Sequence, residues 1–162
     1  LFAPMIIPDI VLAIALLSFF TLIKLTLGLH SIIMAHVVFN IAFVCAVVRA
    51  RLKTYDWSLN EASRDLGASA WTTFWRITFP LIRPSVVAAA LLAFTLSIDE
   101  FIIAYFTAGA GQSSTTLPMQ IYAMIRFGVT PEINAMATIV MLVSFVMVFA
   151  AQRIDRGRIP GA

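Results

Sequence analysis

The chain has 162 residues, of which 61% are hydrophobic and only 12% charged, and its formal net charge is +3. Water-soluble domains usually carry about 25% charged residues, so this composition excludes an ordinary soluble domain and indicates an integral membrane protein. The basic residues stand at the ends of apolar runs rather than in one patch, which indicates membrane topology and argues against a nucleic-acid partner. The single cysteine, Cys45, excludes an internal disulfide framework and a cysteine-rich metal site.

The first apolar run covers roughly residues 1–25, about the length that crosses a hydrocarbon core of roughly 30 Å. Because the chain opens at Leu1 inside this run and without an initiator methionine, we expect it to be the C-terminal part of a longer protein. Pro4 and Pro8 predict a kink near the start of this helix. Asp9 follows directly, and it either bonds backbone groups freed at a helix break or lines a polar pathway.

A second spanning helix is predicted over about residues 31–48. His36 and Asn40 lie four residues apart on one face of it, where hydrogen bonding between helices is a commoner role than lining a pathway. Three basic residues follow this run: Arg49, Arg51 and Lys53. By the positive-inside rule, the segment after them, about 54–80, lies in the cytoplasm.

The cytoplasmic segment carries the pattern of a short helix. Ser58 and Glu61 stand in the S-x-x-E relation of a capping box, in which each side chain accepts a hydrogen bond from an otherwise unpaired backbone N–H. Gly67 follows at the position where a left-handed C-terminal residue is least costly. One face of this helix would be apolar, with Leu59, Ala62 and Leu66.

A second short helix is predicted around Trp71, Phe74 and Trp75, and Pro80 and Pro84 are expected to mark its end and the start of the next helix. Large aromatic side chains in a loop that faces water indicate a surface that another molecule covers. We therefore interpret the segment as a docking element.

Two more spanning helices are predicted, over about residues 85–108 and 133–152. The link between them, about 109–132, is then external, and residues 117–125 within it predict a short amphipathic helix at the membrane interface. Two crossings return the chain to the cytoplasmic side, as the positive-inside rule requires for the basic residues near the C-terminus: Arg153, Arg156 and Arg158.

The third predicted span holds Asp99 and Glu100 between two apolar stretches. Each acid at membrane depth is costly, and adjacent residues point about 100° apart on a helix, so only one can face a central path. One interpretation is a helix break near Ser97, with both acids at the outer mouth or paired to Arg126. The interpretation that we favour is contact with a positively charged substrate during passage. Tyr105 and Tyr122 either offer cation–π contact to an ammonium group or anchor the chain at the membrane interface.

The cytoplasmic segment resembles the EAA loop of the inner-membrane permease subunits of ATP-binding-cassette importers. The shared pattern, E-A-x-(three)-G-(nine)-I-x-x-P, is made here by Glu61, Ala62, Gly67, Ile77 and Pro80. Two positions depart from the usual pattern, which has a second Ala and a Leu there: Ser63 and Phe79.

Three further stretches, at residues 8–10, 97–100 and 128–135, look like the spermidine/putrescine branch of that family. The resemblance covers nearly the whole chain. The EAA loop is specific for the transporter class, whereas the other stretches are less specific for the substrate.

The resemblance implies an all-α integral membrane protein in the bacterial inner membrane. Residues 1–162 would be a single fragment of a type I importer permease, with about four transmembrane helices and a cytoplasmic coupling helix. About two further spanning helices would precede it. The implied partners are a cytoplasmic ATPase dimer, a second permease subunit, an extracytoplasmic substrate-binding protein and membrane lipid.

The resemblance also implies roles for particular residues. The coupling helix would insert into a groove on the ATPase, with contacts from Glu61, Ala62, Leu66, Gly67, Trp71, Phe74, Ile77 and Pro80. The substrate pathway would contain Asp99, Glu100, Asp9 and Tyr105. Neither a catalytic residue nor a metal ligand nor a cofactor is expected in this chain, because the partner ATPase would bind ATP and Mg²⁺.

Three other functions are weighed against a polyamine importer. A permease for another small solute such as iron would share the scaffold. An ion-driven secondary carrier would also have broken helices and buried acids, but would work without an ATPase. An intramembrane hydrolase with Asp9 and Asp99 as a dyad has little support, since no local signature marks Asp99 as catalytic.

Overall fold

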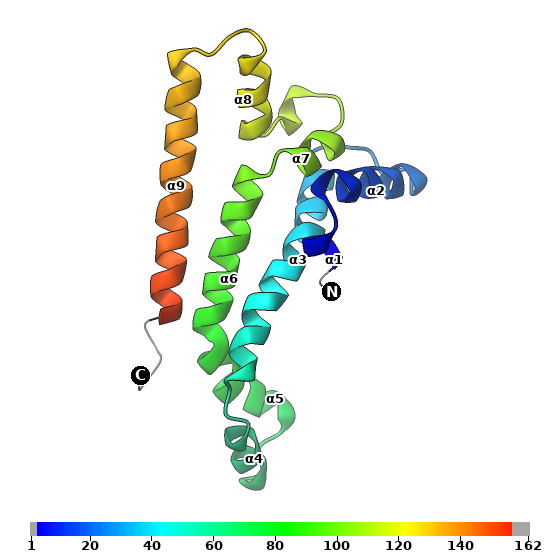
Figure 1. Cartoon of the computed structure of the whole chain (residues 1–162). Helices are drawn as coiled ribbons and strands as arrows, with labels where there is room; N and C mark the ends of the chain where they lie inside the picture. The colour runs from blue at the N-terminus through cyan, green and yellow to red at the C-terminus, as the bar shows by residue number, and fades with distance from the viewer. Residues whose placement is uncertain (1–2, 157–162) are drawn as a thin grey trace.

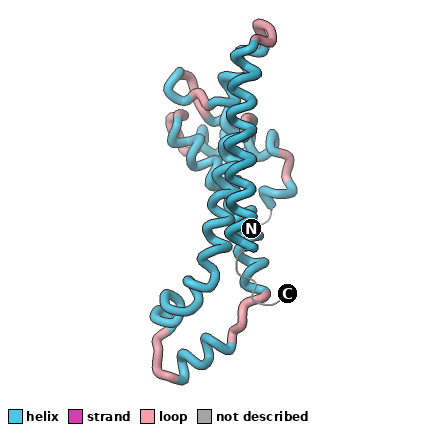
Figure 2. Tube along the Cα trace, turned by 90° about the vertical axis from the view of Figure 1, so that its left-hand side faces the viewer, coloured by secondary structure: helices cyan, strands magenta, loops and turns pink. Residues whose placement is uncertain are grey.

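The computed structural model describes residues 3–156, and this part of the chain consists of helices and their links, without strands. The prediction of an all-α architecture is confirmed. Three long helices form an elongated body: α3 (Leu29–Lys53), α6 (Phe79–Asp99) and α9 (Pro131–Arg156), with α6 packed between the other two (Figure 1). In the view turned by 90°, the same helices run along one axis and the loop between α3 and α6 extends below them (Figure 2).

Within the described residues, three stretches are long and apolar enough to cross a membrane. They are Leu29–Lys53, Ala70–Asp99 and Pro131–Ala150. The predicted spans at 31–48 and 133–152 fall within α3 and α9. Of the basic residues expected near the cytoplasmic C-terminus, Arg158 lies outside the described residues.

The first predicted span differs from the structure. Instead of one helix over residues 1–25, α1 (Ala3–Ile6) is followed by α2 (Asp9–Leu22), because Pro8 adopts an extended conformation that starts a new helix. The 14 residues of α2 give about 21 Å of helix, too short to cross the hydrocarbon core unaided. Figure 1 shows α2 lying across α3 rather than along it.

The roles predicted for the two prolines are borne out only in part: Pro80 stands in the first turn of α6, as predicted, but Pro84 lies inside α6, and the chain remains helical before Pro80. A continuous helical stretch runs from Ala70 to Asp99, through α5 (Ala70–Thr73), the π-helical turn η1 (Phe74–Thr78) and α6. A proline ring clashes with the carbonyl of the residue four positions earlier. The wide turn before Pro80, where the Phe79 N–H bonds the Phe74 carbonyl, provides room for that ring.

The span predicted over 85–108 is also divided. α6 ends at Asp99, and the short helix α7 (Ile102–Thr107) follows after an extended Glu100. Behind it lie a 3₁₀ turn, η2 (Gln112–Ser114), and α8 (Leu117–Ile125), which confirms the short helix predicted at 117–125.

The main core joins α2, α3 and α7 rather than the long helices alone. Its buried members are Leu12, Ala13, Phe20, Ala35, Phe39 and Ile103. A buried hydrogen bond of 2.6 Å from the Ser31 hydroxyl to the Thr107 carbonyl also fastens α3 to α7. The break after α6 is therefore held against a packed core.

Candidate functional site

The N-terminus of helix α4 (Ser58–Asp65) is capped by an unpredicted residue. Asp56 accepts hydrogen bonds from the Ser58 N–H at 3.0 Å and from the Ser58 hydroxyl at 2.7 Å. These two bonds lower the pKa of Asp56. The predicted Ser58–Glu61 capping box is wrong, since Trp57 holds the N-cap position and Ser58 is already the first helical residue.

The C-terminus of α4 follows the prediction. Gly67 has a φ of +83°. The Gly67 N–H donates to the Arg64 carbonyl at 2.8 Å and the Ala68 N–H donates to the Ser63 carbonyl at 3.1 Å. This pair of bonds is the Schellman arrangement that ends a helix at a left-handed residue.

The inner face of the loop is polar. The Asn60 amide donates to the Thr78 hydroxyl at 3.2 Å, and the buried hydroxyls of Ser63 and Thr73 lie 3.0 Å apart. These contacts tie α4 to the start of the long helix. They also explain why a serine is accommodated at position 63, because Thr73 supplies its partner. The sequence analysis missed this role, although the hydroxyl residues were its signal.

The outer face of the same loop is apolar and exposed. Leu66 is 90% exposed and Trp71 is 70% exposed. An aromatic cluster lies here, with ring centroids 5.1 to 6.4 Å apart: Trp71, Phe74, Trp75 and Phe79. The Trp71 and Phe74 rings are stacked, and the other pairs meet edge-to-face or at a tilt. Of the residues assigned to coupling, Ile77 is half-buried and the others are exposed: Glu61, Ala62, Leu66, Gly67, Trp71, Phe74 and Pro80.

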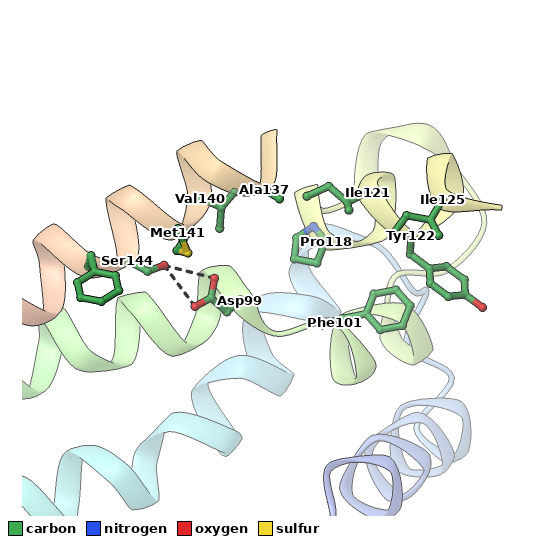
Figure 3. Close-up of a pocket in the computed structure, with 11 residues that line it drawn as sticks. Asp99, Phe101, Pro118, Ile121, Tyr122, Ile125, Ala137, Val140, Met141 and Ser144 are labelled. Atoms are coloured by element: carbon green, nitrogen blue, oxygen red, sulfur yellow. Dashed lines mark hydrogen bonds between the residues drawn. The ribbon is translucent and has the colours of Figure 1, made fainter. Parts of the chain in front are cut away.

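At the other end of α6, the two adjacent acids point to different neighbours. Asp99 is exposed and turns toward α9, where the Ser144 hydroxyl donates to both carboxylate oxygens at 3.3 Å (Figure 3). Glu100 is only 9% exposed and turns toward α7, where the Ile103 and Ala104 N–H groups donate to its carboxylate at 2.7 and 2.9 Å. The expectation that only one acid faces a path is consistent with this divergence.

Asp99 lies at the edge of an apolar pocket of about 580 Å³ between the end of α6, α8 and α9 (Figure 3). Apart from the Asp99 carboxylate and the Ser144 hydroxyl, its walls are mostly hydrocarbon and aromatic. They contain Phe101, Pro118, Ile121, Tyr122, Ile125, Ala137, Val140, Met141 and Phe145. The Phe101 and Tyr122 rings lie 4.9 Å apart.

Both acids lie beside the interior of an apolar helix. Ser144, the partner of Asp99, is about 20 Å along α9 from Pro131, well inside the candidate span. His36, the neighbour of Glu100, is about 10 Å along α3 from Leu29. An acid at such depth is costly enough to call for a partner or a function.

The remaining residues assigned to the pathway lie elsewhere. Asp9 is the exposed first residue of α2 and is not among the residues that line the Asp99 pocket. Tyr105 is exposed on α7, and its ring lies 5.4 Å from Phe101 and 6.4 Å from Tyr122. Among the described residues, no three His, Cys, Asp or Glu side chains gather where they could hold a metal ion.

The sequence matches the family model for the inner membrane component of binding-protein-dependent transport systems over residues 1–159. It is 44% identical over 161 residues to the spermidine/putrescine transport system permease protein PotC of Escherichia coli K12, covering 99% of this chain and 60% of that protein. Identity to PotC of Haemophilus influenzae is 40%, over 96% of this chain and 60% of that protein. Identity to the putrescine transport system permease protein PotI of E. coli K12 is 39%, over 97% of this chain and 59% of that protein. The chain thus spans about 60% of the length of these relatives.

Proposed function

The chain belongs to the family of inner membrane components of binding-protein-dependent transport systems, and from this we propose that it is part of a permease subunit that imports polyamines such as spermidine and putrescine. Its relatives in E. coli and H. influenzae carry that function in their names. ATP would be hydrolysed by a separate cytoplasmic subunit with its own Mg²⁺ site. A second permease subunit and an external capture protein would complete the transporter.

The loop between α3 and α6 would receive the motion of the ATPase. Its polar inner contacts make α4 and the start of the long helix one unit, since Asn60 bonds Thr78 and Ser63 bonds Thr73. Its apolar outer face, with Leu66 and Trp71 exposed, suits insertion into a groove on a partner. A push on α4 would then be passed directly to the continuous helix that ends at Asp99.

The observation that carries the substrate assignment is the pocket at Asp99. A polyamine alternates ammonium groups with short methylene chains. The Asp99 carboxylate could pair with an ammonium group, and the apolar wall could receive the methylenes. The neighbouring Tyr122 and Phe101 rings add aromatic faces that attract cations.

Uptake by the full-length protein tests this function. The complex with its ATPase, second permease and capture protein is reconstituted in liposomes, and ATP-dependent uptake of radiolabelled spermidine and putrescine is measured. We expect Asp99→Asn to lower kcat/KM by about tenfold or more, because it removes a charge-assisted contact. Glu132→Gln, an exposed acid in the first turn of α9, is the control and should leave uptake near the parental value.

Two outcomes would contradict the proposal at different points. Failure of the assembled parent to take up any polyamine would exclude the substrate class and leave the family assignment intact. Equal uptake by Asp99→Asn and the parent would remove Asp99 from the pathway.

A further inference from the structure

Three polar side chains from α3 and the end of α6 meet beside the break before α7. The Nδ1 atom of His36 on α3 lies 2.5 Å from the Ser97 hydroxyl on α6. The Nε2 atom of His36 lies 3.4 Å from the carboxylate of Glu100. Both His36 and Glu100 are more than nine-tenths buried. The cluster therefore joins two long helices at the point where one of them ends.

We propose that His36 is a positioning residue that, with Ser97 and Glu100, latches the α6–α7 break to α3 and so holds the transport path in its resting shape. Asp99 then serves as the one substrate-facing acid of the pair. This role rests on the proposed function, because it assigns to the break a movement during transport.

The contacts of Glu100 support a latch rather than a ligand. One carboxylate oxygen accepts the Ile103 N–H and the other accepts the Ala104 N–H, so the side chain caps α7. An acid in this setting would have to give up both bonds to meet a substrate, leaving buried backbone donors unpaired. Among the described residues, the Asp99 carboxylate accepts hydrogen bonds from the exposed Ser144 contact, which a substrate could replace without leaving buried backbone donors unpaired.

His36 has the geometry to hold that acid in place. If the Ser97 hydroxyl donates to Nδ1, the proton of the neutral ring resides on Nε2 and faces Glu100. Nε2 is buried and has no hydrogen-bond partner among the described residues, so the Glu100 carboxylate is the group that can satisfy it. A small approach of α3 to α7 would close the 3.4 Å separation into a hydrogen bond.

The latch is tested in the reconstituted full-length complex by two readouts. In uptake assays we expect His36→Leu and Glu100→Gln each to lower the maximal rate with little change in KM, while Asp99→Asn mainly raises KM. The effects of the two latch substitutions on the maximal rate should not multiply. The maximal rate of the double variant should therefore lie within about twofold of that of the less active single variant. His36→Gln, which can still donate to Glu100 and accept from Ser97, should retain about half of the parental rate or more.

The second readout does not depend on the substrate. Basal ATP hydrolysis without polyamine should rise severalfold in His36→Leu and remain near the parental rate in His36→Gln, because an unlatched break can move without substrate. A complex that transports no polyamine but shows this rise would contradict the substrate assignment and support the latch. The latch is overturned if His36→Leu raises KM as Asp99→Asn does, or if its effect multiplies fully with that of Glu100→Gln. It is equally overturned if His36→Gln, in a complex that assembles normally, behaves like His36→Leu in both readouts.

Discussion

At the scale of single residues, two glycines with left-handed backbones do different work. Gly109 has a φ of +72°, and a Cβ built there would lie 2.7 Å from the Leu27 Cβ and 2.8 Å from the Leu27 carbonyl oxygen. Gly67 has a φ of +83°, but no atom of the described part of the chain lies within 4 Å of a Cβ built there. Gly109 thus allows the end of α7 to touch the link between α2 and α3, whereas Gly67 only ends a helix.

The pair gives a matched prediction. Gly67→Ala should lower the free energy of unfolding by about 1 kcal/mol, since it adds only backbone strain. Gly109→Ala adds a clash with the Leu27 backbone and should destabilise by roughly 2–5 kcal/mol. Thermal unfolding of the purified complex measures both. Equal melting temperatures for the two variants would show that the Leu27 approach can relax without cost.

The adjacent acids Asp99 and Glu100 differ in their surroundings in the same way. Adjacent positions on a helix already point apart, and the end of α6 between Asp99 and Glu100 separates them further. One carboxylate joins the exposed side toward α9 and the other the buried side toward α3. The assignment of both acids to one pathway is therefore replaced, in our proposal, by two separate roles.

At the scale of helices, α4 shows how a local motif can be misassigned. The S-x-x-E pattern at 58–61 is that of a capping box. In the structure, however, the side chain that caps this N-terminus is Asp56, two residues before Ser58. Its carboxylate accepts both the N–H and the hydroxyl of Ser58, which stands one position beyond the N-cap and so cannot act as the capping residue. A cap from before the first helical residue leaves Glu61 exposed and available to a partner.

Hydrogen exchange tests the cap. Asp56→Ala should speed exchange in the first turn of α4, whereas Asp56→Asn, which still offers an acceptor oxygen, and Glu61→Ala should not. Because the pKa of Asp56 is lowered in the folded chain, the stabilisation that this carboxylate gives to the folded state is fully present above the unfolded-state pKa. That contribution is lost only as pH falls through the folded-state pKa, so protection should not vary near neutral pH. If exchange were faster in Glu61→Ala but not in Asp56→Ala, the Ser58–Glu61 capping box would be supported instead of the Asp56 cap.

In the molecule as a whole, the long helices separate the two regions to which we assign functions. The α4–α5 loop extends from one end of the body, next to the basic residues that close α3, and α8 lies at the other (Figure 1). The Asp99 pocket lies toward the α8 end, joined to the loop by the continuous stretch from Ala70 to Asp99. A movement at either end can thus be passed along one helix.

Cysteine labelling tests this orientation. In a Cys45→Ser background of the full-length protein, Ser113→Cys should react with a membrane-impermeant thiol reagent added outside intact cells. Arg64→Cys, exposed on α4, should react only after the cells are permeabilised. The opposite pattern would place the loop outside and contradict its proposed contact with an ATPase.

Local sequence patterns were sufficient to predict the membrane class, the long apolar helices, the left-handed Gly67 and the short helix at 117–125. These features depend on composition, on run length and on the local conformational preferences of a few neighbouring residues. The EAA spacing also located the exposed loop. Local chemistry was sufficient for each, because the residues that decide it lie within a few turns of one another.

The neighbours of each helix could not be predicted from the sequence and depend on packing in three dimensions. The crossing of α2 over α3 and the contact of His36 with Glu100 join segments whose pairing no local pattern encodes. Hydrophobic periodicity distinguishes the faces of a helix, but α2, α3 and α6 are apolar on all sides, so periodicity does not indicate which face packs. Packing and the need to pair buried polar groups therefore select the partners, and they separate Asp99 from Glu100.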